Sequence, residues 1–233
     1  MIQVENYSKS YSGKKVVDNI SFEVKDGEIF GFIGHNGAGK TTTIKSMVGI
    51  LDFEEGKILI NGIDITKSPI ECKKQIAYIP DNPDIYENLK GIEYLNFIAD
   101  VFELSRELRL NRFKKYSELF GMTQFLGDEI STYSHGMRQK LVIISALIHD
   151  PKILVLDEPF VGLDPKAVFD LKEAMRELCK TGTSIFFSTH ILDVAEKLCD
   201  KVAIIKDGKI VKIGSMEEIK GDTSLENVFL ELV

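Results

Sequence analysis

The residues best suited to chemistry lie between Gly34 and Thr41, where the sequence runs Gly-His-Asn-Gly-Ala-Gly-Lys-Thr. This order satisfies the spacing G-x-x-x-x-G-K-[ST], in which glycines allow a loop whose backbone N–H groups turn inward around phosphate. A helix that begins near Gly39 adds its positive N-terminal end, and Lys40 reaches the outer phosphates. Thr41 supplies a hydroxyl for Mg²⁺. The pattern therefore predicts a phosphate-binding site rather than an ordinary glycine-rich turn.

Two acidic residues, Asp157 and Glu158, follow the apolar run Ile153-Leu154-Val155-Leu156. An apolar strand that ends in an acid is the usual second half of a phosphate site, so we expect Asp157 to hold the magnesium ion. Glu158 follows at once, where its carboxylate could take a proton from attacking water. An Asp-Glu pair at a strand end can also be a solvated turn, and the pair alone does not exclude this.

The stretch Tyr133-Ser134-His135-Gly136-Met137-Arg138-Gln139-Lys140 contains no obvious catalytic pair. Ser134 can cap a helix, and Gly136 leaves its amide unobstructed, so the helix start could bind an anion. The expected apolar face of this helix comprises Met137, Leu141, Ile144 and Ile148. From these residues alone, a plain capped helix is the favoured interpretation.

The order of the expected elements indicates how these residues are positioned. Strand patterns fill much of the first sixty residues, in ISFEV, EIFGFI and KILING. From Lys90 to Phe102 apolar residues recur at helical spacing, and charged helix formers continue through Phe120. The runs ILVLD, from Ile153, and SIFFS, from Ser184, are typical of parallel strands covered on both faces.

Helical patterns alternate with these apolar runs. The segment after Pro165 predicts a helix that stops near Gly182, and a shorter helix follows from Ile191. The expected apolar face of the first comprises Ala167, Leu171, Ala174, Met175 and Leu178. The stretch KVAIIKDGKIVKIG predicts a hairpin around Asp207-Gly208. We therefore expect one α/β domain over residues 1–233, with a helical subdomain inserted at roughly residues 84–148.

Composition narrows the classes of function. The chain has 233 residues and a net charge of -7, from 29 Lys+Arg against 36 Asp+Glu, so a nucleic acid is not an expected partner. Its three cysteines, Cys72, Cys179 and Cys199, have no metal-ligand spacing and indicate reduced thiols of a cytosolic protein. The N-terminus lacks the apolar core of a signal peptide, and no apolar run is long enough to span a bilayer.

Five stretches occur in an informative order: GHNGAGKTT, YSHGMRQK, ILVLDEP, GLD from Gly162 to Asp164, and STH from Ser188 to His190. Together they resemble the ATP-binding subunits of ABC transporters, and the resemblance covers essentially the whole chain. It implies a P-loop NTPase of the ABC ATPase type with a RecA-like parallel-sheet core, an N-terminal antiparallel β subdomain and an inserted helical subdomain. It also implies ATP hydrolysis, with ATP and Mg²⁺ bound.

The resemblance assigns roles to residues whose own chemistry is ambiguous. It implies that two copies pair head to tail, and that the signature sequence of one copy binds the terminal phosphate of ATP held by the other. The signature residues are Ser134, His135, Gly136 and Met137. His190 is expected to sense the terminal phosphate and position Glu158, and the loop of Asp164 to cross the dimer interface. Alone, His190 could simply end a buried strand, and Asp164 could simply cap the helix at Pro165.

The nucleotide-binding residues implied by the resemblance are Tyr11, Gly34, His35, Asn36, Gly37, Ala38, Gly39, Lys40, Thr41 and Thr42. Tyr11 corresponds to an aromatic residue that stacks on adenine, although a surface tyrosine is the competing interpretation. The family usually has glutamine after Pro80, where this chain has Asp81. A carboxylate can bind Mg²⁺ but cannot donate a hydrogen bond to water. The expected metal ligands are Thr41, Asp81 and Asp157.

The pattern Tyr-Ser-x-Gly-Met, together with IAYIPDNPDIYENL, looks like the subset of exporters for drugs, antibiotics, peptides and sodium. The expected partners are an integral membrane permease and a second ATPase subunit, either an identical copy or a paralogue. The chain would then lie peripherally on the cytoplasmic face of the membrane. The alternatives are a non-transport ABC ATPase acting on nucleic acid or ribosomes, and a small-molecule kinase that uses the same phosphate loop.

Overall fold

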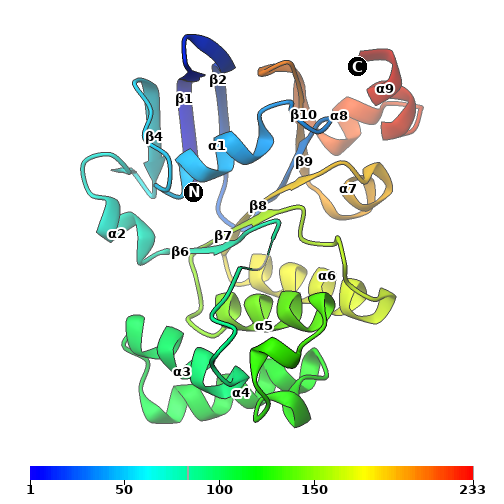
Figure 1. The fold of residues 1–233 in the computed structure, drawn as a ribbon. Helices are drawn as coiled ribbons and strands as arrows, with labels where there is room; N and C mark the ends of the chain where they lie inside the picture. The colour runs from blue at the N-terminus through cyan, green and yellow to red at the C-terminus, as the bar shows by residue number, and fades with distance from the viewer. Residues whose placement is uncertain (83, 233) are drawn as a thin grey trace. The chain divides into compact units, whose positions relative to one another are not determined.

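Two units of structure make up the chain (Figure 1), and the computed structural model describes residues 1–82 and 84–232. The first unit contains Met1–Tyr78, Lys152–Pro159 and the chain from Met175 onward. The second contains Ile79–Pro151 and Phe160–Ala174. The chain therefore leaves the first unit twice and returns to it twice.

An antiparallel sheet forms part of the first unit. Its strands are β1 (Ile2–Tyr11), β2 (Lys14–Val24), β4 (Glu55–Ile60) and β5 (Ile63–Asp64), in the order β2-β1-β4-β5. β1 pairs with both β2 and β4, so Val4 lies opposite Phe22 on one side and opposite Ile58 on the other. The strands expected in the first sixty residues are confirmed here.

A second sheet has the strand order β10-β9-β3-β8-β7-β6. The strands are β3 (Ile29–Ile33), β6 (Ile76–Ile79), β7 (Ile153–Asp157), β8 (Ser184–Thr189), β9 (Lys201–Lys206) and β10 (Lys209–Ser215). β3 pairs parallel with β8 and β9, and β7 pairs parallel with β8. β9 and β10 form the antiparallel hairpin expected around Asp207-Gly208. Every residue of β3, β7 and β8 is buried, as the continuous apolar runs predict.

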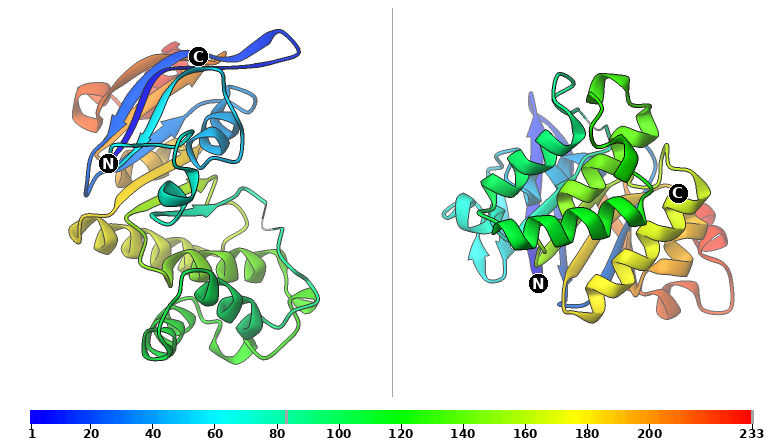
Figure 2. Two further views of the ribbon diagram at one scale, coloured as in Figure 1. Left: turned by 90° about the vertical axis from the view of Figure 1, so that its left-hand side faces the viewer. Right: turned by 90° about the horizontal axis from the view of Figure 1, so that it is seen from below.

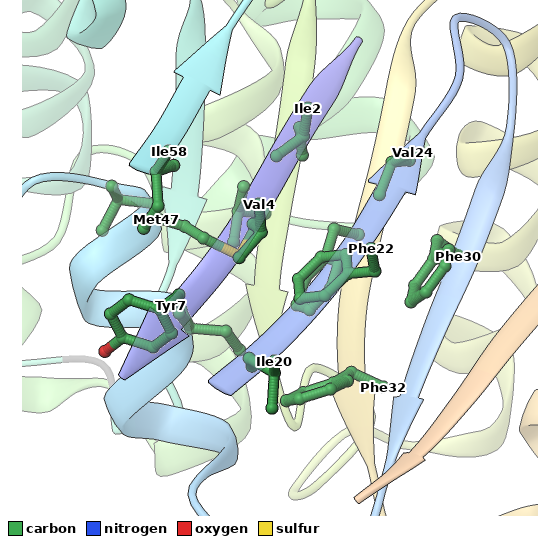
Figure 3. Close-up of a cluster of buried hydrophobic side chains, with 14 of the residues drawn as sticks. Ile2, Val4, Tyr7, Ile20, Phe22, Val24, Phe30, Phe32, Met47 and Ile58 are labelled. Carbon is green, nitrogen blue, oxygen red and sulfur yellow. The ribbon is translucent and has the colours of Figure 1, made fainter. Parts of the chain in front are cut away.

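The hydrophobic core of the first unit joins the two sheets. Phe22 of β2 stacks on Phe30 of β3 with ring centroids 5.4 Å apart, and on Phe186 of β8 at 5.5 Å. Figure 3 shows Phe22, Phe30 and Phe32 in this cluster, together with apolar side chains from β1, β4 and α1. This packing fixes the strands of the parallel sheet, whose ends carry the predicted site.

Five helices of the first unit are described: α1 (Lys40–Met47), α2 (Pro69–Lys73), α7 (Leu192–Leu198), α8 (Met216–Lys220) and α9 (Leu225–Leu232). α1 follows β3 and packs against β7 and β2. Because α1 starts at the carboxyl end of β3, the loop between them lies at the strand end where ligands usually bind in α/β proteins.

The second unit is mainly helical (Figure 2). Its helices α3 (Gly91–Val101), α4 (Arg106–Leu119) and α5 (His135–Leu147) pack against one another. The short 3₁₀ turns Thr123–Phe125 and Ile130–Thr132 connect α4 to α5. Helix α6 (Pro165–Lys180) begins in this unit and continues into the first at Met175. The helices expected from Lys90, after Pro165 and after Ile191 are all present.

Candidate functional site

The phosphate loop connects β3 to α1. Gly39 is the N-cap of α1, with φ of 107°, a conformation that side chains disfavour, so a glycine is required there. His35, Asn36 and Gly37 are exposed, while Ala38 is buried and its N–H donates to the His35 carbonyl at 3.1 Å. The first N–H groups of a helix lack acceptors within the helix, so this loop can present them to an anion.

Lys40 begins α1 and its side chain is only 6% exposed. Its Nζ donates to the carbonyl of Gly34 at 2.7 Å and to that of His35 at 3.2 Å. The same Nζ lies 3.3 Å from Oε1 of Glu158. The lysine charge is therefore fixed between the loop and the acid at the end of β7, where phosphate oxygens can compete for it.

Oxygen donors suited to Mg²⁺ come from two elements. Thr41 is exposed in the first turn of α1, and Thr42 beside it is half-buried. Asp157 ends β7 and is 1% exposed. One hydroxyl and one carboxylate suit Mg²⁺, which binds few protein ligands and keeps several waters and phosphate oxygens. In the described part of the chain no three His, Cys, Asp or Glu side chains gather as a metal cage, and a site of this type does not need one.

Glu158 lies immediately beyond β7 and is held at both carboxylate oxygens. Oε1 faces Lys40, while Oε2 lies 2.9 Å from Nδ1 of His190 and accepts the His190 backbone N–H at 3.3 Å. The Glu158 side chain is 11% exposed and that of His190 is 51% exposed. The structure therefore brings together the base and the histidine that were predicted for hydrolysis.

Ser188, to which the motifs assign no role, contacts this pair of acids. It is fully buried in β8, its hydroxyl donates to Oδ1 of Asp157 at 2.5 Å, and its Oγ accepts the Glu158 backbone N–H at 3.1 Å. Phe229 of α9 contacts the phosphate loop: its ring lies edge-on to that of His35, with centroids 5.0 Å apart. Each contact joins segments distant in sequence, so the only sequence signal was the position of Ser188 within Ser-Thr-His.

Tyr11 ends β1 and pairs with Lys14 across the turn into β2. It is 44% exposed, so its ring is accessible from solvent. The Lys9 Nζ lies 5.5 Å from the Tyr11 ring centroid and 3.4 Å from Oε1 of Glu54. The exposed ring is compatible both with adenine stacking and with a surface tyrosine.

The signature stretch starts α5 within the second unit. Ser134 is the N-cap, and its Oγ accepts the Met137 N–H at 3.3 Å. Ser134 and His135 are exposed, and Met137 is half-buried. Tyr133 is buried and donates its hydroxyl to the Phe125 carbonyl at 2.5 Å. The capped helix start predicted from the residues is therefore present and open to solvent.

The loop of Asp164 lies against the signature helix in the same unit. A Cβ added at Gly136 would lie 2.9 Å from the Gly162 carbonyl, so only glycine permits this approach. Lys140 lies 2.6 Å from Oδ2 of Asp164, and its hydrogen bond holds the pKa of that carboxyl below its usual value. Oδ1 of Asp164 accepts the Ala167 N–H at 2.9 Å, which is the helix cap that the residues suggested.

Asp81, the third expected metal ligand, belongs to the second unit. It is exposed and follows Pro80 beyond the end of β6. Thr41 and Asp157 belong to the first unit. Coordination by Asp81 therefore stays a prediction.

Comparison with known proteins shows which family the chain belongs to. A family model described as ABC transporter matches residues 17–161, which is more than half of the chain. The chain belongs to the ABC transporter ATP-binding proteins. The resemblance inferred from the five ordered stretches is thereby confirmed, and this ABC ATPase is an enzyme that binds and hydrolyses ATP.

Relatives match this ABC ATPase along nearly its whole length. The ABC-type transporter ATP-binding protein EcsA of Bacillus subtilis is 36% identical, with 100% of this chain and 96% of EcsA covered. The linearmycin resistance ATP-binding protein LnrL of the same organism is 35% identical, with 97% and 74% covered. A solved ATP-binding subunit of an ABC transporter has a TM-score of 0.96 at 35% identity, covering 100% of this chain and 99% of that one. The predicted fold class is confirmed.

Because its relatives are ATP-binding subunits of transporters, a membrane permease is the partner that they imply. Over residues 1–82 and 84–232, no helix combines the length and the apolar character that crossing a bilayer requires.

Proposed function

We propose that this ABC ATPase is the motor of an exporter. In this proposal two copies, or one copy and a paralogue, pair head to tail around two ATP·Mg²⁺ and drive separate permease subunits. The chain then lies on the cytoplasmic face of the membrane without crossing it. The observation that carries the proposal is that the chain has two helix starts suited to binding phosphate: the Gly34–Thr41 loop before α1, and the exposed, serine-capped start of α5.

The hydrolytic step follows from the side chains at the end of β7. Oε1 of Glu158 lies on the side of Lys40, so we assign it as the atom that takes the proton from attacking water. His190 Nδ1 holds the opposite oxygen, Oε2, and so fixes the rotation of the carboxylate. Lys40 directs its charge toward the phosphates. Thr41 and Asp157 would hold Mg²⁺, which would supply positive charge to offset the charge that develops on the phosphate oxygens.

Pairing explains the second phosphate site. The first turn of α5 presents N–H groups and the hydroxyl of exposed Ser134, and the Gly136 backbone packs on the neighbouring Gly162 loop. In the proposed dimer this surface binds the terminal phosphate of the other copy's ATP. That phosphate charge holds the interface together, so hydrolysis and phosphate release loosen the pair and provide a two-state mechanical element.

Export is supported by the family subset and by one relative. The stretch Tyr-Ser-His-Gly-Met matches the pattern of exporters. LnrL is named for resistance to linearmycin, and drug resistance is a usual result of export. Cargo specificity would then belong to the permease. Isolating native membranes and identifying the hydrophobic protein and solute that co-purify with this chain tests the assignment directly.

The sandwich dimer is tested with Glu158→Gln, which retains the side-chain shape and removes the base. Analytical ultracentrifugation should show a dimer that forms with ATP and Mg²⁺ and dissociates slowly, while the wild-type chain returns to monomer as it hydrolyses. Only monomer at saturating ATP, with and without the permease, would exclude the sandwich.

Two further measurements separate the competing classes of function. Phosphate released to water, rather than transferred to an acceptor, distinguishes the motor from a kinase. Hydrolysis stimulated by nucleic acid or by ribosomes would favour a non-transport ABC ATPase.

A further inference from the structure

One buried hydroxyl joins the two acids at the end of β7. The Ser188 Oγ–H donates to Oδ1 of Asp157 at 2.5 Å, and the same oxygen accepts the Glu158 N–H at 3.1 Å. Ser188 is 0% exposed, so water does not compete for these bonds. A hydroxyl has one hydrogen to donate and lone pairs to accept with, so both contacts can exist at once.

The pairing of the strands sets this contact. β7 and β8 are parallel, and Asp157 lies directly opposite Ser188 in their register. Both strands are buried along their length, which makes a register shift costly. The hydroxyl is therefore presented to Asp157 and to the next peptide group by the rigid core of the sheet.

Glu158 needs such support because its backbone is strained. Its φ is 48°, in the left-handed region that residues with a Cβ disfavour, and it precedes Pro159, which further restricts the preceding residue. Strained residues persist where the surrounding structure determines them. The bond from the Glu158 N–H to Ser188 anchors the strained peptide at its start, while Lys40 and His190 hold the side chain.

We propose that Ser188 is a positioning residue for ATP hydrolysis. Its hydroxyl fixes the rotation of the Asp157 carboxylate, which would hold Mg²⁺, and the position of the backbone that carries the Glu158 side chain, so that the two acids keep one relative geometry. This inference rests on the proposed roles of Asp157 and Glu158. Ser188 itself acts only through them.

The same strand offers a matched control. Ser184, at the opposite end of β8, is also 0% exposed, and its hydroxyl donates to Oδ1 of Asp26 at 3.1 Å, away from the predicted site. Ser184→Ala removes a hydroxyl of equal burial from the same strand. It measures the general cost of such a loss.

The experiment compares the full chain with Ser188→Ala, Ser188→Cys, Ser188→Thr and Ser184→Ala. Trinitrophenyl-ATP binding is titrated in EDTA and then against Mg²⁺, and kcat and KM are measured by phosphate release. For Ser188→Ala and Ser188→Cys we expect unchanged binding in EDTA. The half-saturating Mg²⁺ concentration should rise, and kcat should fall, each by about 10- to 100-fold, as when a metal ligand loses its supporting hydrogen bond. Ser188→Thr keeps the hydroxyl and should retain more activity than either.

Three results would overturn the inference. The first is a Ser188→Ala chain whose kcat and Mg²⁺ dependence equal those of Ser184→Ala. The second is a Ser188→Cys chain as active as wild type, which would make shape rather than the hydrogen bond decisive. The third is loss of nucleotide binding in EDTA by every folded Ser188 variant, which would make the role structural. If wild type and Ser184→Ala both fail to hydrolyse ATP, the proposed function has failed instead.

Discussion

His149 should make the helical unit sensitive to acid. This histidine lies just beyond α5, and its ring stacks on that of Phe102 with centroids 3.7 Å apart and planes 3° apart. The pKa of His149 is lowered from 6.5 to about 4: burial is the largest cause, the nearby Arg112 acts in the same direction, and Asp150 acts in the opposite one. Arg112 is held in place by a hydrogen bond to the Ile148 carbonyl at 2.7 Å. Protonated His149 would therefore place a second positive charge beside a fixed one.

The direction and size of the effect follow from linkage. Between about pH 6.5 and pH 4 the unfolded chain binds a proton at His149 that the folded chain does not, so the free energy of unfolding falls as the pH falls. Each pKa unit corresponds to about 1.4 kcal/mol, so the loss amounts to about 3 kcal/mol over this window. Above pH 6.5 His149 is neutral in both states and contributes no pH dependence.

The test uses His149→Phe, which keeps an aromatic ring against Phe102 and does not titrate. Because the chain has no tryptophan, urea unfolding is followed by far-ultraviolet circular dichroism, at pH 7.5, 5.5 and 4.5. The comparison at pH 7.5 measures any change in packing. Between pH 7.5 and 4.5 wild type should lose about 2 to 3 kcal/mol more stability than the variant. Equal losses in the two proteins, within about 0.5 kcal/mol, would refute the reasoning.

Three further predictions concern the nucleotide and the signature. Tyr11→Ala should weaken ATP binding by about 1–3 kcal/mol, or about 5- to 150-fold in Kd. Tyr11→Phe keeps the aromatic ring and should bind ATP as wild type does. If calorimetry gives Tyr11→Ala the same ATP affinity as wild type, stacking on Tyr11 is excluded. Gly136→Ala places a methyl group 2.9 Å from the Gly162 carbonyl, so hydrolysis and the melting temperature should fall while ATP affinity is retained. Ser134→Arg should abolish hydrolysis and dimer closure but leave ATP binding at Lys40 intact, and lost binding by a folded monomer would contradict the assignment.

The parts of the fold that the sequence predicted are those encoded locally. Continuous apolar runs predicted β7 and β8, apolar residues at helical spacing predicted α3 and α6, and Asp207-Gly208 predicted a hairpin. The phosphate loop was predictable because its spacing is short and its glycines have specific conformational roles. The helical subdomain at roughly residues 84–148 stays a prediction. In the structure, the chain passes into the second unit after Tyr78 and leaves it for the first time after Pro151.

The remaining features depend on pairing between distant segments, which residue patterns do not specify. Ser188 and Asp157 are opposite each other only because of the β7–β8 register. The left-handed conformation of Glu158 has no sequence signal, since glycine or asparagine would be the expected residue there. The sequence suggested that Gly136 leaves its own backbone amide accessible. The structure shows a second reason for glycine there, because a Cβ at this position would lie too close to the Gly162 carbonyl. Strand register and close backbone contacts thus determine how residues that the motifs had already located are held in place.

The contacts of Lys40 indicate how phosphate can bind without breaking the hydrogen bonds between Lys40 and the loop. An ammonium group has three hydrogens, and two of them go to the carbonyls of Gly34 and His35. The contact with Glu158 at 3.3 Å is a charge interaction without hydrogen-bond alignment. A phosphate oxygen can therefore take the third hydrogen while both loop bonds remain. Because phosphate is more negative than a carboxylate, Lys40 should interact more strongly with phosphate than with Glu158. The contact between Lys40 and Oε1 of Glu158 then weakens, while His190 still holds Oε2. The oxygen assigned to proton transfer is thus freed by the arrival of the group that is to be hydrolysed.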